Sequence, residues 1–214
     1  MPWEVRWFNE ESIHYDTVLK WFKSIDNVFQ TETRTDQYIF CPYSEDIGIK
    51  LRQYTANNEQ LPRLEIKWRK STIELKLLNN SIVGTAEDWI KWVWTGIPVV
   101  STDKSIDFFA KLPHGPGISI KKNRLMRKYK FDKKVMKSTT WIEDCQNGLA
   151  CEITKISAVN KGWWSFGFEA FGSTINENEF KKAIASALSD FPLKLKKESS
   201  YGYPHWLTKI GYLC

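Results

Sequence analysis

The sequence predicts an α+β protein whose antiparallel strands form a closed or nearly closed β-barrel, or tunnel, with helices packed outside. Three observations support this fold class. At least five segments alternate charged residues with bulky apolar ones, and a period of two is typical of β-strands. Strands and helices do not follow the regular βα order of a parallel sheet. Three predicted helices are available to cover the apolar faces, which would turn the charged faces inward.

Length and composition predict a single domain that spans residues 1–214 and binds anions. The formal net charge is +6, and 14% of the residues are aromatic, which is typical of a well-packed globular protein. The four cysteines are widely separated and predict neither a disulfide nor a metal cluster. No segment approaches the roughly 20 apolar residues of a membrane helix, and the charged N-terminus does not resemble a signal peptide. We therefore expect a cytoplasmic protein without membrane contacts.

The first elements are expected to be a strand, a helix and a second strand. Residues 3–8 alternate bulky apolar side chains with Glu4 and Arg6, which predicts a strand. Residues 12–27 place their apolar side chains on one helical stripe and carry acidic residues near the start. Residues 34–41 predict a strand that ends before a proline.

The next two strands carry a long charged side chain at every second position. They are GIKLR at residues 48–52 and LEIKWR at residues 64–69, and a loop at 55–62 is expected to join them. Pro62 is expected just outside the second strand, where it removes no interior hydrogen bond. Residues 72–78 alternate again and predict a further strand. An open sheet with one solvated face would also produce such alternation in any single strand.

The middle of the chain contains a predicted helix and a basic strand. Thr85 followed by Asp88 is typical of a helix start, so residues 85–96 are expected to form a helix whose tryptophans cover the barrel. The Gly- and Pro-rich residues 113–117 predict a turn. Residues 118–131 are strongly basic and predict a strand.

Two strands, a helix and an aromatic tail complete the chain. GLACEITKISAV at residues 148–159 and WWSFGFEAFG at residues 163–172 each carry polar residues on one face. Asn176 is expected to cap a helix that ends near Ser189. The tail from residue 200 onward is aromatic and is expected to pack on the body of the protein.

If the helices cover the apolar faces, the charged side chains line an interior. Buried charges are costly unless they pair with one another or meet a ligand. The expected interior set has seven cations and four carboxylates, and its surplus of three positive charges suits a multiply charged anion. The cations are Arg6, Lys50, Arg52, Lys67, Arg69, Lys122 and Arg124, and the carboxylates are Glu4, Glu65, Glu152 and Glu169.

The order of these charged segments resembles the CYTH-like, or triphosphate tunnel, superfamily. The resemblance spans residues 3–172 and rests on Glu4, GIKLR, LEIKWR, Lys122-Asn123-Arg124, Glu152, and Glu169 in FGFEAFG. It implies an eight-stranded tunnel in which Lys and Arg hold a triphosphate and acidic residues hold Mg²⁺ or Mn²⁺. The members include inorganic triphosphatases, thiamine triphosphatases and class IV adenylyl cyclases. The resemblance assigns the seven cations above to the substrate, and it assigns Glu4, Glu152 and Glu169 to a metal ion.

The first strand departs from the family pattern Glu-x-Glu-x-Lys. It reads Glu4-Val5-Arg6-Trp7-Phe8, so a guanidinium replaces the second carboxylate and a phenyl ring replaces the lysine. Arg6 would pair with Glu4 or repel a divalent cation, and phosphoryl transfer depends mainly on charge neutralisation by such a cation. Two functions remain open on this basis: metal-assisted hydrolysis of a triphosphate, and anion binding without turnover.

A third function class is nucleic-acid binding. The run KKNRLMRKYKFDKK at residues 121–134 interleaves cations with aromatic rings that could stack on bases. A strand with one charged face would show the same pattern, so we expect a small phosphate-rich anion as the partner instead. The three histidines are far apart and lack a metal-binding spacing, and Ser165 is not in a nucleophile elbow. The sequence indicates no oligomeric state.

Overall fold

The computed structural model of the chain describes residues 3–39, 44–56, 59–95, 117–132, 135–139, 147–172 and 175–210. Its strands are β1 (Trp3–Glu10), β2 (Gln30–Ile39), β3 (Ile47–Ala56), β4 (Glu59–Leu77), β5 (Ile82–Thr95), β6 (Gly117–Asp132), β7 (Val135–Thr139), β8 (Gly148–Ala158) and β9 (Lys161–Phe171). Its helices are α1 (Tyr15–Ser24), α3 (Glu177–Ala187) and α4 (Tyr203–Lys209), with a short 3₁₀ helix η1 (Lys197–Ser199).

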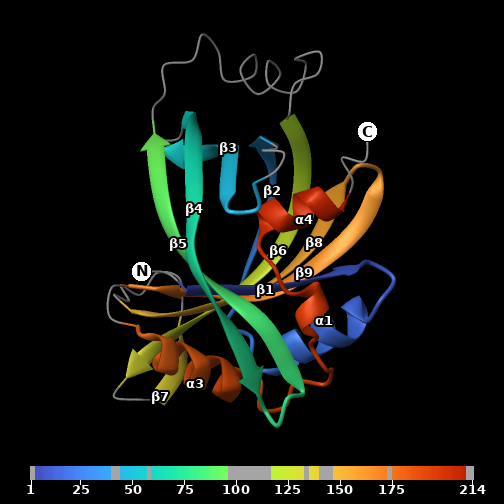
Figure 1. The fold of residues 1–214 in the computed structure, drawn as a ribbon, viewed down its shortest axis with the longest axis vertical. Coiled ribbons are helices and arrows are strands. Elements are labelled where there is room, and N and C mark those ends of the chain that lie inside the picture. The colour runs from blue at the N-terminus through green and yellow to red at the C-terminus, as the bar shows by residue number, and fades with distance from the viewer. Residues whose placement is uncertain are drawn as a thin grey trace.

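Eight of these strands close an antiparallel barrel (Figure 1). Their order is β2-β3-β4-β5-β1-β9-β8-β6, and β6 pairs back with β2 from Gly117 to Met126. The described part of β7 pairs with β6 as an extension of the sheet. The predicted α+β fold with a closed antiparallel barrel is therefore confirmed.

The β4–β5 hairpin is longer than the sequence predicted. Residues 64–69 and 72–78, expected as two strands, belong to the single strand β4, and a β-bulge between Arg69 and Ser71 joins the two parts. Pro62 lies within β4 opposite Gln53, and not outside the strand, because the β3–β4 ladder continues to Ala56 and Glu59.

The expected helix at residues 85–96 is wrong, because these residues belong to β5. From Ile82 to Thr95 β5 lies along β4, and its Trp, Ile and Val residues fit a pleated strand well. The local helix-start signal is outweighed by this long-range pairing. Trp92 and Trp94 also do not cover the barrel: they face outward beside Trp68, and the three are 43–50% exposed.

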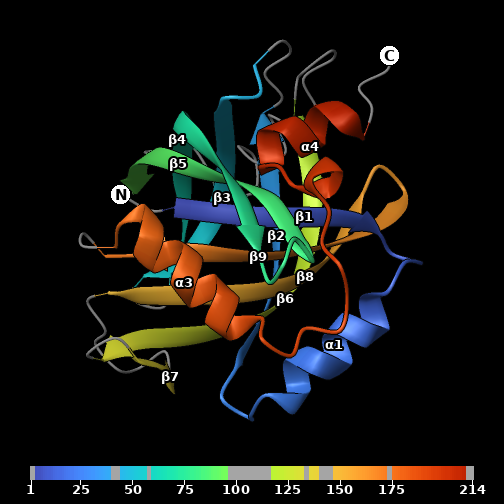
Figure 2. The ribbon, with the colours of Figure 1, turned by 60° about the horizontal axis from the view of Figure 1, so that its bottom comes forward.

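The main apolar core lies between the outer face of the barrel wall and two helices, as predicted (Figure 2). Side chains at alternate positions of β1 and β9 point into this core, which is why Trp7 and Phe166 are fully buried. The helices contribute Val18 and Phe22 from α1, and Phe180 and Ile184 from α3. As predicted, Asn176 caps α3: its side chain accepts from Glu179 N, and the Glu179 carboxylate accepts from Asn176 N, each at 3.0 Å.

The C-terminal segment continues the wall where β1 and β5 separate. β1 pairs with β5 through residues Trp3–Val5. Further along, Tyr201 N donates to Arg6 O at 3.1 Å, and Thr85 N donates to Ser200 Oγ at 2.9 Å. This chain segment thus supplies backbone and side-chain hydrogen bonds between two strands that have moved apart.

Helix α4 packs on side chains that point into the barrel. The ring of Trp206 stacks on Phe8 with centroids 5.1 Å apart, and Tyr203 stacks on Tyr38 at 5.4 Å. These rings join a second apolar cluster with Ile120, which faces inward from β6. The aromatic tail therefore packs on the body as expected, but α4 closes one end of the barrel interior and does not lie outside the wall.

Arg127 on β6 connects the barrel to α1. Its side chain is fully buried, and its guanidinium donates to the carbonyl oxygens of Phe22 at 2.8 Å, Asp26 at 3.2 Å and Val28 at 3.3 Å. It also pairs with the Asp26 carboxylate. The last carbonyls of a helix have no partners within the helix, so Arg127 satisfies groups that burial would otherwise leave unpaired.

Replacement of this arginine is expected to destabilise the protein. Arg127→Met keeps the apolar part of the side chain but leaves buried carbonyl oxygens without donors, which costs about 2–4 kcal/mol. Urea unfolding followed by tryptophan fluorescence measures the difference. Lys121→Met, an exposed change on the same strand, is the control and should stay within about 0.5 kcal/mol of the parent. Equal stability of the two variants would contradict this role for Arg127.

Candidate functional site

A cavity of about 400 Å³ lies inside the barrel. Among the described residues its wall contains eight cations and five carboxylates, so the positive charges exceed the negative ones by three. The cations are Arg6, Arg34, Lys50, Arg52, Lys67, Lys91, Lys122 and Arg124, and the carboxylates are Glu4, Glu32, Glu65, Glu152 and Glu169. The charged faces of the strands therefore converge on one cavity inside the barrel.

Of the charged residues assigned to this interior by the sequence, all except Arg69 line the cavity. Arg69 lies at the β-bulge of β4. Its guanidinium donates to Glu87 Oε1 at 2.7 Å and pairs with the partly exposed Asp46. Arg69 therefore ties β4 to β5 and to the chain before β3 and does not line the cavity, so its predicted contact with a ligand stays a prediction.

Sequence reasoning missed part of the cavity wall. Glu32, Arg34 and Asp36 alternate along β2, but the strand was predicted to begin only at residue 34, so this charged face was not recognised. Lys91 was missed because its segment was predicted as a helix. The signal for Lys91 was present, since Glu87, Trp89 and Lys91 are separated by the strand period of two.

The first group of charges in the cavity is a chain of ion pairs, which we call the Arg6 cluster: Glu4, Arg6, Lys67, Arg124 and Glu152. Arg6 Nη1 donates to Glu152 Oε1 at 2.9 Å, and Arg6 Nε donates to Glu4 Oε1 at 3.3 Å. Lys67 Nζ donates to Glu4 Oε2 at 2.7 Å, and Arg124 Nε donates to Glu152 Oε2 at 3.0 Å. Every carboxylate oxygen of Glu4 and Glu152 therefore accepts from a cation.

These ion pairs keep both carboxylates ionised although they are buried. Burial by itself raises the pKa of Glu4, but Lys67 and Arg6 outweigh it and lower the pKa to about 2. The pKa of Glu152 lies well below its usual value for the same reason, with Arg124 and Arg6 as the partners that outweigh burial.

A glycine makes room for Arg6. Gly167 on β9 lies opposite Arg6, and a Cβ there would be 2.7 Å from Val5 O and 3.3 Å from Arg6 Cβ. The next inward-facing residue, Ser165, accepts a hydrogen bond from Arg6 Nη1 at 3.1 Å. Residues 163–172 thus provide the space and a polar partner that let the guanidinium reach Glu152.

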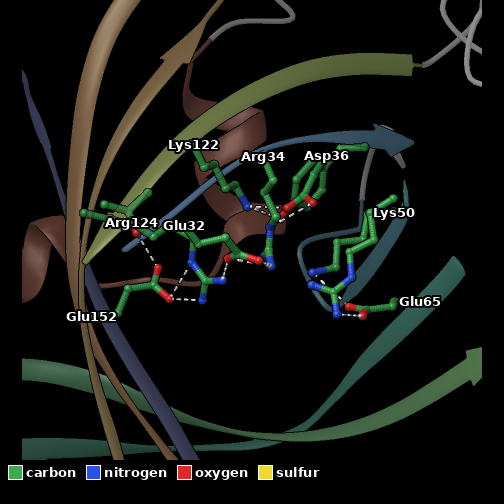
Figure 3. A network of polar contacts seen from close by, with 12 residues as sticks. Glu32, Arg34, Asp36, Lys50, Glu65, Lys122, Arg124 and Glu152 are labelled. Carbon is green, nitrogen blue, oxygen red and sulfur yellow. Dashed lines mark hydrogen bonds and ion pairs between the residues drawn. The ribbon is translucent and has the colours of Figure 1, made fainter. Parts of the chain in front are cut away.

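Asp36 holds the second group of charges, as Figure 3 shows. Lys122 Nζ donates to Asp36 Oδ2 at 2.8 Å and to the Tyr38 hydroxyl at 2.7 Å, and Arg34 Nε lies 3.1 Å from Asp36 Oδ1. The ammonium group also lies 3.8 Å from the centre of the Tyr203 ring. Burial lowers the pKa of Lys122 to about 8, although Asp36 acts in the opposite direction.

The third group, the Glu65 cluster, consists of Lys50, Arg52, Arg63, Glu65 and Lys91. The Glu65 side chain is fully buried. Its Oε1 lies 2.8 Å from Arg52 Nη2 and 2.9 Å from Arg63 Nε, and its Oε2 lies 2.8 Å from Lys50 Nζ and 3.6 Å from Lys91 Nζ. Burial lowers the pKa of Lys50 to about 7. The pKa of Glu65 falls to about 2, because Lys50, Arg52 and Lys91 outweigh its burial.

The carboxylates assigned to Mg²⁺ or Mn²⁺ are not arranged as free ligands. Glu4 and Glu152 direct their oxygens at Arg6, Lys67 and Arg124, and Arg6 lies between them. In the described part of the chain, no three His, Cys, Asp or Glu side chains gather closely enough to hold a metal ion. A divalent cation prefers carboxylate oxygens that are not neutralised by guanidinium groups, so Glu4 and Glu152, as they are paired here, do not fit the metal. The predicted metal site stays a prediction.

The basic run at residues 121–134 does not lie on one face. β6 keeps an unbroken register with β2 and β8 from Lys121 to Met126, so Lys122 and Arg124 point into the cavity while Lys121 is exposed outside. Arg127 is buried against α1. The described part of the run is therefore divided between the cavity, the core and the surface.

Comparison with known proteins supports the fold. No model of a known protein family matches the chain, and no curated protein does. No helix in the described ranges is long and apolar enough to cross a membrane. Among solved structures, the PH1819 protein from Pyrococcus horikoshii OT3 is similar to this chain, with 13% sequence identity and a TM-score of 0.50. The match covers 99% of this chain and 100% of that chain. A chain in the structure of the Schizosaccharomyces pombe Mediator head module is also similar, with 9% sequence identity and a TM-score of 0.41. The match covers 88% of this chain and 96% of that chain. The second likeness is too weak to support an argument, and the first shows a shared fold alone.

Proposed function

We propose that the barrel cavity binds a multiply charged phosphate anion such as tripolyphosphate and does not hydrolyse it. The observation that carries this proposal is the excess of cations over carboxylates in the cavity wall, eight against five, which stays positive when the buried Asp36 beside Arg34 and Lys122 is added. A polyanion would neutralise this surplus, and guanidinium groups offer paired donors that match phosphate oxygens. The sequence resemblance to the CYTH-like superfamily adds support, because it implies an eight-stranded tunnel of this kind around a triphosphate.

The arrangement of the carboxylates argues against metal-assisted hydrolysis. Phosphoryl transfer depends mainly on positioning and on neutralisation of charge by divalent cations. Glu4 and Glu152 are already neutralised by the cations of the Arg6 cluster. The cavity therefore retains groups that hold an anion, while the groups that would hold its metal ion are engaged by Arg6, Lys67 and Arg124.

The second candidate function is metal-assisted triphosphate hydrolysis by a divergent CYTH-like enzyme. The position of Glu169 favours it, because this carboxylate lines the cavity and is paired in register with Glu4 on the neighbouring strand. A bound phosphate would also compete with Glu4 and Glu152 for Arg6, which would release carboxylate oxygens. Assays of binding and of phosphate release separate the two candidates.

Tripolyphosphate is expected to bind with a stoichiometry of one, as measured by isothermal titration calorimetry. Arg52→Gln removes a charged donor from the cavity wall and should weaken binding by about tenfold. Lys70→Gln, on the neighbouring strand β4 but outside the cavity, is the matched control and should bind like the parent. No phosphate release is expected from tripolyphosphate, ATP or thiamine triphosphate with Mg²⁺ or Mn²⁺. Release by the parent protein would favour the second candidate, and absence of binding would overturn both.

Arg6→Glu tests what the arginine does to the metal site. The change brings three carboxylates together at residues 4, 6 and 152, and their repulsion should lower the melting temperature. Mn²⁺ is expected to raise the melting temperature of this variant but not that of the parent or of Arg6→Gln, because only the glutamate adds a third carboxylate beside Glu4 and Glu152. An equal effect of Mn²⁺ on all three proteins would show that Arg6 does not exclude the ion.

Anion affinity is expected to fall between pH 6 and pH 8. The pKa of Lys50 is lowered to about 7, so its ammonium is charged below this pH and loses its proton as the pH rises, which removes one positive charge from the cavity. Tripolyphosphate affinity measured across this range should therefore depend on pH more steeply in the parent than in Lys50→Met. Titration of the ligand affects both proteins equally, so identical profiles would contradict a role for Lys50.

A further inference from the structure

The surplus of positive charge is concentrated in the Glu65 cluster. There, three cations of the cavity wall, and Arg63 beside it, surround one carboxylate. In the Arg6 cluster the three cations face two carboxylates, and Arg124 also pairs with Glu32, so that this part of the cavity is balanced. Figure 3 shows the Lys50–Glu65 contact on a different side of the cavity from the Arg124–Glu152 contact.

The register of the sheet accounts for this concentration. Arg52 on β3 lies directly opposite Arg63 on β4, and Lys67 on β4 lies directly opposite Lys91 on β5. Like charges in directly opposite positions destabilise a sheet. Glu65, which lies between Arg63 and Lys67 on the central strand, is the carboxylate that offsets these repulsions.

The cations around Glu65 hold it by charge and not by well-formed hydrogen bonds, since Glu65 Oε1 and Oε2 are buried without a hydrogen-bond partner in the described part of the chain. Arg52 contacts Glu65 through Nη2, while its Nε is buried and has no hydrogen-bond partner in the described part of the chain. Arg63 Nε is buried as well, and although it lies 2.9 Å from Glu65, its geometry does not make a hydrogen bond. Buried donors without partners are costly, and a second anion would supply acceptors for the Arg52 and Arg63 donors that the present position of Glu65 leaves unpaired.

We infer that Glu65 is an internal counter-ion that determines which anions bind beside it. Its cluster is a subsite for the terminal phosphate of a polyanion, and Glu65 occupies part of that subsite permanently. With Lys50 protonated, the cluster carries three net positive charges in the presence of Glu65, so a phosphate group with two charges neutralises it better than a monovalent anion does. This inference rests on the proposed function and adds to it the place and the charge selectivity of binding.

Glu65→Gln tests the inference, because the amide has the shape of the carboxylate but not its charge. Tripolyphosphate affinity is expected to rise about tenfold in this variant, and nitrate, a monovalent anion, should become a measurable competitor. Lys91→Gln, which reduces the same cluster by one cation, should lower tripolyphosphate affinity by about tenfold. Glu74→Gln, an exposed change on the same strand, is the control and should bind like the parent.

The melting temperature supplies a second measurement if Glu65→Gln is unstable. Without its counter-ion, the variant is expected to melt at a lower temperature in anion-poor buffer and to recover with tripolyphosphate more than the parent does. If the parent binds tripolyphosphate and Glu65→Gln binds it equally or more weakly, the role of Glu65 is overturned and the proposed function stands. If the parent does not bind tripolyphosphate, the proposed function itself fails.

Discussion

Charged side chains enclosed by a closed barrel must neutralise one another, and this requirement organises the interior of the protein. The Arg6 cluster satisfies it with ion pairs that leave no carboxylate oxygen of Glu4 or Glu152 without a cation. Removal of one partner from a buried pair costs about 3–5 kcal/mol, because the remaining charge stays buried without compensation. The Glu65 cluster satisfies the requirement only in part, since it contains more cations than one carboxylate can neutralise. This incomplete neutralisation links the architecture of the barrel to the anion binding that we propose.

The apolar side chains of the barrel strands must also be buried, and different helices cover different groups of them. Helices α1 and α3 cover the outside of β1 and β9, and Arg127 ties α1 to β6. Helix α4 instead covers inward-facing rings such as Phe8, so the charged cavity has an apolar boundary at one end. Trp68, Trp92 and Trp94 remain exposed on the outer face of β4 and β5. In the described part of the chain, no helix or strand therefore buries the outer face of the barrel at these three tryptophans.

Much of the fold and of the cavity wall could be predicted because alternation is a local property of the chain. Lys50, Glu65 and Lys67 lie in segments whose period of two is unbroken, and they line the cavity. The errors occur where a distant strand decides the conformation. Residues 85–96 carry a helix-start signal, yet they pair with β4 along its length. Arg69 keeps the inward phase of LEIKWR and lies opposite Trp89, but Glu87 and Asp46, which are distant in the chain, hold its guanidinium away from the cavity.

The sequence by itself determined the direction of the charges: bulky apolar side chains on one face of each strand left the other face to the interior. Only the tertiary structure decided which charges meet. Arg6 reaches Glu152 because β1 pairs with β9 and β9 with β8, and the fourfold contact of Glu65 depends on the register of three strands. A change of one residue in register would turn these side chains to the opposite face. Periodicity is encoded within each strand, whereas register depends on partners that are distant in the chain.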